Sequence, residues 1–115
     1  MESKQILNRK EILEQALEIV THDRNKKYGE PEDNFGMISD LWTTYLNGYF
    51  GSTISISPED VAVMMCLFKI GRMASGEYSP DSYVDLAGYA ACAGEVAGKN
   101  YQTIEDAEKS GLGAA

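Results

Sequence analysis

The feature that most constrains the fold is the apolar run VAVMMCLF, Val61–Phe68, which directly follows the residues SPED. In SPED, Ser57 is a suitable N-cap, Pro58 suits the first helical position, and Asp60 completes a capping box with Asp in place of Glu. The sequence therefore predicts a helix from Pro58 to about Ala74. Because this helix has no polar face along the apolar run, we expect it to be buried, either in the domain or in an oligomer.

A second helix begins with the same device. Ser79 is placed to cap it, Pro80 follows, and Asp81 puts a carboxylate in the first turn, where it favours the helix dipole. This helix is predicted to reach about Gly98. Since only a short loop joins the two helices, they should lie side by side and antiparallel, as a helical hairpin.

Two more helices are predicted from apolar residues at helical spacing, over about 3–22 and 34–48. Between the second of these and the hairpin, Ser or Thr alternates with Ile over 52–57. This short alternation allows an edge strand pair there.

The length of the chain, 115 residues, is enough for one domain with a modest core. We therefore expect a compact, all-α, four-helix domain over 1–100, built around the helical hairpin. Residues 101–115 are predicted to be a C-terminal tail that is partly helical or frayed.

The net charge of the chain is −8, which argues against a nucleic-acid-binding surface because such surfaces are usually basic. A small phosphorylated ligand needs only a local cluster of donors and stays possible. The longest apolar run is too short to span a bilayer, and the first residues, MESKQILNRKE, lack the apolar region of a signal peptide. We therefore expect a cytoplasmic protein without a membrane partner.

Three residues with reactive side chains point to ordinary packing. Cys66 and Cys92 lie in apolar segments without metal-site spacing, which indicates reduced core thiols. His22 is the single histidine, so a site built from several histidines is ruled out. No cofactor is expected.

The candidate binding residues fall in two places, of which the first is the hairpin. Lys69 and Arg72 lie one turn apart near the end of its first helix. Asp81, Asp85 and Tyr89 follow at i, i+4 and i+8, so they form one ridge at the start of its second helix. One interpretation is a structural ion-pair cluster that suits both helix dipoles. The other is a polar pocket. Burying ions costs several kcal/mol each unless they are paired, and in this interpretation a ligand is one of the partners.

The second place is the stretch DRNKKYGEPEDNF, residues 23–35. Its cations can serve simply to neutralise the end of the first helix. Its combination of side chains also suits a nucleotide: Arg24 and Lys27 for phosphate, Tyr28 for stacking on a base, and Asn34 for the edge of the base.

Small residues are frequent in the predicted helix over 80–98, where Ala and Gly recur from Ala87 to Gly98. They allow another helix to approach closely, within the chain or across a subunit interface. Because such residues bury little area, we expect a homo-oligomer.

Three segments together, DRNKKYGEPEDNF, ISPEDVAVMMCLFKIGRM and DSYVDLAGYAA, resemble a family of small phage and prophage proteins of unassigned function. The resemblance covers roughly residues 20–92. It implies a viral origin and a location in the cytoplasm of the infected or lysogenic bacterial host, and it supplies no reaction. The positions that carry it are Arg24, Tyr28, Gly29, Asn34, Asp60, Lys69, Arg72, Asp81, Asp85, Gly88 and Tyr89.

A looser similarity is to the all-α, MazG-like NTP pyrophosphohydrolases, which hold Mg²⁺ with a helical Glu-x-x-Glu and a later acidic pair. Glu11 and Glu14 have the first spacing, whereas Asp81 and Asp85 depart from the expected second pair. The similarity implies Mg²⁺ as a cofactor only if the protein is such an enzyme. The cations among these carboxylates favour holding phosphate over metal-dependent hydrolysis.

These patterns lead to three hypotheses. The first is a phage protein without catalytic residues that sequesters a nucleotide-derived host immune signal, such as a cyclic oligonucleotide or a cyclic ADP-ribose derivative. The second is a Mg²⁺-dependent NTP or dNTP pyrophosphohydrolase. The third is an interaction module that inhibits a host protein through its acidic face.

Overall fold

The computed structural model describes residues 5–23 and 31–111, and these residues contain α-helices and no β-strand. The helices are α1 (Arg9–Glu18), α3 (Pro31–Phe50), α4 (Pro58–Ser75) and α5 (Pro80–Lys109), and a π-helical turn, Ile19–Asp23, continues α1. The all-α class is confirmed. No helix in the described ranges is long and apolar enough to cross a membrane.

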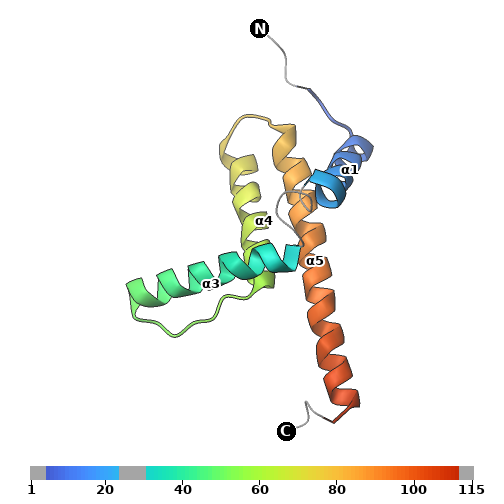
Figure 1. Cartoon of the computed structure of the whole chain (residues 1–115). Coiled ribbons are helices and arrows are strands. Elements are labelled where there is room, and N and C mark those ends of the chain that lie inside the picture. The colour runs from blue at the N-terminus through green and yellow to red at the C-terminus, as the bar shows by residue number, and fades with distance from the viewer. Residues whose placement is uncertain (1–4, 24–30, 112–115) are drawn as a thin grey trace.

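The centre of the fold is the antiparallel hairpin of α4 and α5, as the sequence predicts, with α1 packed against the first half of α5 (Figure 1). The capping box at the start of α4 is present: the Ser57 hydroxyl accepts from the Asp60 amide at 3.0 Å, and Asp60 accepts from the Ser57 amide at 2.9 Å. Ser79 is the N-cap of α5, but its side chain makes no capping hydrogen bond.

Two groups of buried side chains hold the helices together. The larger one joins the start of α3 to the hairpin through Phe35, Val61, Ala62 and Cys92. The smaller one joins α1 to α5 through Leu7, Ala16 and Val84. The hairpin therefore shares its apolar surface between two partners, α3 at one place and α1 at another.

The first helix begins later than the sequence indicates, at Arg9 instead of residue 3. The reason is a capping box that the sequence analysis missed, in which the Asn8 side chain accepts from the Glu11 amide at 2.8 Å. The second helix begins earlier than predicted, at Pro31, because proline is well tolerated in the first turn.

The predicted edge strand pair over 52–57 is wrong. This segment runs back along α3, and side chains of α3 bind its backbone: the Ile56 amide donates to Thr43 Oγ1 at 2.9 Å and the Ile54 amide to Asn47 Oδ1 at 3.0 Å. These bonds occupy amides that a neighbouring strand would need.

The last helix is longer than predicted, since α5 continues past Gly98 to Lys109 and so includes the first part of the predicted tail. Pairs one turn apart support the extension, including Glu95–Lys99 at 3.2 Å and Glu105–Lys109 at 3.3 Å. The end of α5 extends beyond the other helices, as does most of α3 (Figure 1).

Candidate functional site

The candidate site centres on an ion pair between the two helices of the hairpin. Lys69 Nζ of α4 lies 2.9 Å from Asp85 Oδ2 of α5, and the two side chains are 17 % and 33 % exposed. The antiparallel arrangement produces this contact, because Lys69 lies toward the end of α4 and Asp85 near the start of α5. The predicted convergence of a cation and a carboxylate is therefore observed for this pair.

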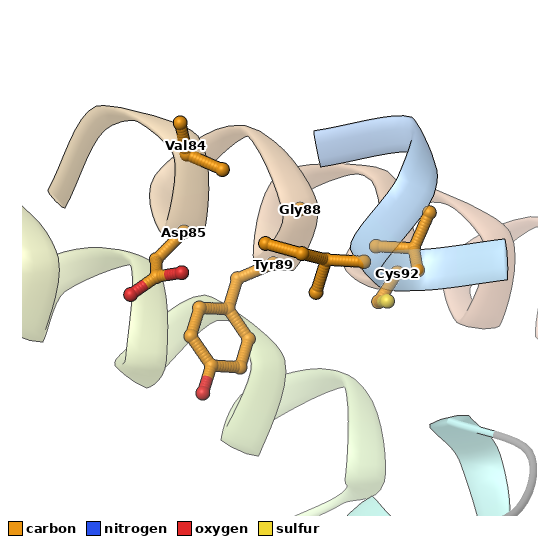
Figure 2. Close-up of a pocket in the computed structure, with 7 residues that line it drawn as sticks. Val84, Asp85, Gly88, Tyr89 and Cys92 are labelled. Carbon is orange, nitrogen blue, oxygen red and sulfur yellow. The ribbon is translucent and has the colours of Figure 1, made fainter. Parts of the chain in front are cut away.

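Tyr89 follows Asp85 by one turn of α5, and the two side chains point toward α4 (Figure 2). The ring of Tyr89 also meets the beginning of α3, since its centroid lies 6.3 Å from that of Phe35. Asn34 immediately precedes Phe35 and is half-buried in the first part of α3. The structure thus groups Lys69, Asp85 and Tyr89, and it places Asn34 next to the residue that contacts Tyr89.

A cavity of about 70 Å³ adjoins this group, between α5 and the π-helical turn. Asp85 and Tyr89 line it together with Gly88, Cys92 and Val20 (Figure 2). Gly88 suits the close approach of the turn, because a Cβ there would lie 3.3 Å from Val20 Cγ1, closer than ordinary van der Waals contact. Part of the small-residue surface of α5 therefore serves to pack this turn within the same chain.

The apolar walls of this cavity were not predicted from the sequence. A signal for one wall was available, since Asp85, Gly88, Tyr89 and Cys92 are spaced i, i+3, i+4 and i+7, which places them on one face of a helix. No comparable signal exists for Val20, because its contact with Gly88 joins segments far apart in the sequence.

The outer members of the predicted cluster lie apart from the cavity. Arg72 and Asp81 are exposed, each one turn closer to the loop that joins α4 and α5. The Arg72 guanidinium carbon lies 5.0 Å from the ring centroid of Phe68, so this cation lies over an aromatic ring. Arg24, Lys27 and Tyr28, which the sequence also predicts, lie outside the described residues.

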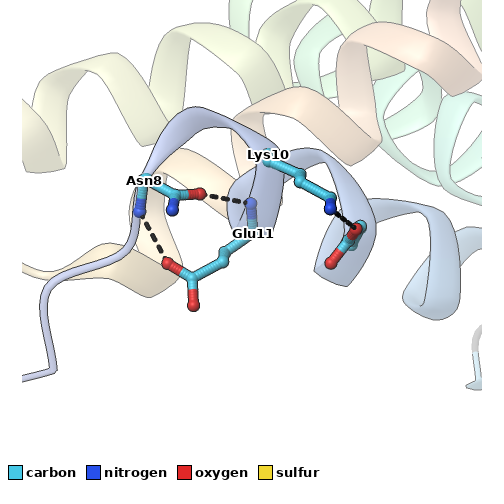
Figure 3. Close-up of polar contacts among 4 residues, drawn as sticks. Asn8, Lys10 and Glu11 are labelled. Carbon is cyan, nitrogen blue, oxygen red and sulfur yellow. Dashed lines mark hydrogen bonds and ion pairs between the residues drawn. The ribbon is translucent and has the colours of Figure 1, made fainter.

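The carboxylates suggested for a metal site are not brought together among residues 5–23 and 31–111, where no group of three His, Cys, Asp or Glu side chains is placed to hold a metal ion. Glu11 Oε1 accepts from the Asn8 amide at 3.0 Å, and Glu14 pairs with Lys10 at 3.8 Å (Figure 3). Asp85 is paired with Lys69. Among the described residues, Glu11, Glu14 and Asp85 thus each have a hydrogen-bond or ion-pair partner within the chain.

One perturbed group lies on α4. Partial burial raises the pKa of the Cys66 thiol, which favours its neutral form. Such a thiol is a poor nucleophile at neutral pH, which agrees with the packing role predicted for it.

Comparison with known proteins shows the class of this chain. It belongs to the family described as Domain of unknown function (DUF6378), whose model matches residues 11–97. This match includes the whole hairpin contact between Lys69 and Asp85, and the predicted relationship to a small phage protein family of unassigned function is confirmed.

Two named relatives come from mycobacteriophages. The chain is 43 % identical over 79 residues to the Gene 55 protein of Mycobacterium phage L5, covering 69 % of this chain and 47 % of that protein. It is 43 % identical over 81 residues to the Gene 55 protein of Mycobacterium phage D29, covering 70 % and 50 %. The match thus spans about half the length of these curated relatives. No solved structure matches the chain.

Proposed function

We propose that this protein binds and sequesters a nucleotide-derived small molecule at the site of Lys69, Asp85 and Tyr89. In the phage setting that its relatives suggest, the ligand is a host immune signal, such as a cyclic oligonucleotide or a cyclic ADP-ribose derivative. The observation that carries the proposal is the half-buried Lys69–Asp85 pair beside a cavity.

The position of this pair distinguishes it from ion pairs elsewhere on the surface. Lys10–Glu14 and Lys109–Glu105 join exposed residues one turn apart on a single helix. Lys69–Asp85 instead joins two helices in an apolar hairpin, where each ion loses part of its hydration. A ligand that offers a phosphate and a hydroxyl can recover that loss by binding both ions.

The chemistry of the three side chains suits a nucleotide. The Lys69 ammonium donates to a phosphate oxygen, and the Asp85 carboxylate, released from Lys69, accepts from a ribose hydroxyl or a base N–H. The Tyr89 ring offers an aromatic surface next to both.

The size of the cavity limits how the ligand binds. Its volume of about 70 Å³ is far below the roughly 300–1,000 Å³ of pockets that enclose a whole ligand. In this proposal the cavity takes one phosphate or the edge of a ribose, and the rest of the ligand lies outside it.

The test is thermal unfolding with a panel of cyclic dinucleotides, cyclic trinucleotides, cyclic ADP-ribose and dNTPs. At 100 times Kd, a ligand that binds only the folded state adds about 2.7 kcal/mol, which raises the Tm by several degrees. Equilibrium dialysis well below the Tm then compares the wild type with Lys69→Gln, which should lose binding at least tenfold. Lys109→Gln is the matched control, because it removes an ion-paired lysine from the exposed end of α5.

Other results would contradict the proposal or support one of the two other functions. Absence of any shift across the panel contradicts the proposal. Mg²⁺-dependent release of pyrophosphate, lost in Glu14→Gln or Asp85→Asn, would establish the hydrolase hypothesis instead. Full phage function after Arg24→Ala and Lys69→Ala would favour the interaction module.

A further inference from the structure

The outward side of α4 is apolar and uncovered. Val63, Met64, Leu67, Phe68 and Ile70 are between 40 % and 60 % exposed, whereas Val61 and Ala62 of the same helix are fully buried. The described residues therefore cover only one side of α4, whose segment Val61–Phe68 is apolar all round. We call these five exposed residues the outer face of α4.

A second exposed apolar surface lies along α3 from Met37 to Tyr49. Met37, Leu41, Tyr45 and Tyr49 recur every four residues and are between 61 % and 71 % exposed. The backbone of 52–57 does not cover them, because it binds Thr43 and Asn47, and these lie on the opposite side of α3 from Tyr45 at helical spacing. We call these four residues the α3 ridge.

The accessible surface area of the chain is larger than that of a compact monomer of the same mass. It is 8,315 Å², whereas a compact monomer of 12.6 kDa exposes about 6,200 Å². The radius of gyration is 17.3 Å, against about 13 Å for a compact chain of this length. The excess of about 2,100 Å² exceeds the roughly 800 Å² that each partner buries in a stable interface.

From these observations we propose that the outer face of α4 and the α3 ridge form the interface with a second copy of this chain. Its composition fits the centre of such an interface, which is enriched in Tyr, Phe and Met and depleted of charge. A second copy is the occupant favoured by the area, because the excess of total accessible surface is larger than the area that each partner buries in a stable interface. This inference is independent of the proposed ligand, and it moves the expected interface from the small residues of α5 to α3 and α4.

The test is the mass of the protein in solution, measured by sedimentation and light scattering at micromolar concentration. The wild type should have at least twice the 12.6 kDa of one chain. Leu67→Glu and Leu41→Glu should each reduce the mass to that of a monomer, because a carboxylate in the centre of the interface would be desolvated. A monomeric wild type would overturn the proposal.

The matched control is Ile104→Glu on α5, since Ile104 is 59 % exposed and Leu67 is 60 % exposed. This variant should keep the mass of the wild type, with unchanged helical circular dichroism. If Ile104→Glu alone gives a monomer, while Leu67→Glu does not, the interface lies on α5 and the proposal is wrong.

A second measurement tests the interface without a charged substitution, in case a charged variant does not fold. A photoreactive phenylalanine analogue at position 67 of the otherwise intact protein should give a cross-linked dimer, and the same group at position 104 should not. Cross-linking at 104 alone contradicts the proposal. Lys69→Gln should remain an oligomer, so failure of the ligand proposal and failure of this interface are measured separately.

Discussion

The two sides of α4 have nearly the same composition and opposite surroundings. The side toward α3 and α5 contains Val61 and Ala62, which are fully buried, and also Lys69, which is paired with Asp85. The opposite side contains Val63, Leu67 and Ile70, which are exposed. The covered side thus carries an ion-paired lysine, whereas the opposite side is apolar from Val63 to Ile70, the reverse of an ordinary surface helix.

In the two proposals above, the two sides of α4 bind different partners. A lysine on the covered side is tolerated because Asp85 compensates it, and the pair lies beside the cavity of the candidate site. A large exposed apolar side is typical of a surface that binds another molecule. The inner side therefore belongs to the candidate ligand site, and the outer side to the proposed interface.

The largest expected effect is that of Phe35→Ala, which empties the contact between α3 and the covered side of α4. Phe35 is 0 % exposed, so its truncation should lower the free energy of unfolding by about 3–5 kcal/mol. The measurement is urea unfolding followed by circular dichroism. Leu67→Ala is the comparison: it should cost less than Phe35→Ala, and its cost should grow with protein concentration. If both variants lost the same free energy of unfolding at every concentration, the proposed difference between the two sides of α4 would be contradicted.

The next effect is that of Lys69→Met, which leaves the Asp85 carboxylate partly buried without its cation. We expect a loss of about 1–3 kcal/mol, between the values for exposed and fully buried pairs. The double variant Lys69→Met/Asp85→Leu should recover part of this loss, because no unpaired charge remains. Lys109→Met should cost under about 1 kcal/mol. A loss for Lys69→Met no greater than that for Lys109→Met would show that the inner pair behaves as a surface pair.

A smaller effect compares the starts of the two hairpin helices. Ser57→Ala removes a side chain that accepts from the Asp60 amide at 3.0 Å, so it should cost about 1 kcal/mol. Ser79→Ala should lower the free energy of unfolding by only a few tenths of a kcal/mol, since the Ser79 side chain makes no capping hydrogen bond. Thermal unfolding of both variants checks the difference. Equal costs would mean that Ser79 caps α5 in solution.

The smallest effect concerns Cys66, where burial raises the pKa of the thiol above its ordinary value of 9.0. The folded protein then holds this proton more tightly than the unfolded chain. The resulting stabilisation of the folded state is fully present below the ordinary pKa of the thiol. It is lost as the pH rises through the raised pKa. Alkylation by iodoacetamide, mapped to Cys66 by mass spectrometry, should therefore reach half its maximal rate above pH 9.0. A midpoint at or below that value would contradict the direction of the shift.

The local rules of helix formation made much of the fold predictable. Ser57, Pro58 and Asp60 define the start of α4 by contacts within one turn, and the short connection to Pro80 makes the hairpin antiparallel. The pairing of Lys69 with Asp85 follows from that topology, so it was within reach of the sequence. The grouping of Tyr89 with Asp85 follows from spacing along a single helix.

The sequence alone thus determined the helical class, the central hairpin and the ionic residues at its centre, because these depend on residues close together along the chain. Tertiary structure decided which side of α4 is covered, since that side is chosen by Phe35 of a distant helix. It also decided that 52–57 follows α3 instead of forming strands, and that Val20 meets Gly88 at the cavity. Helical periodicity states which residues share a face, and only contacts between distant segments select the face that is buried.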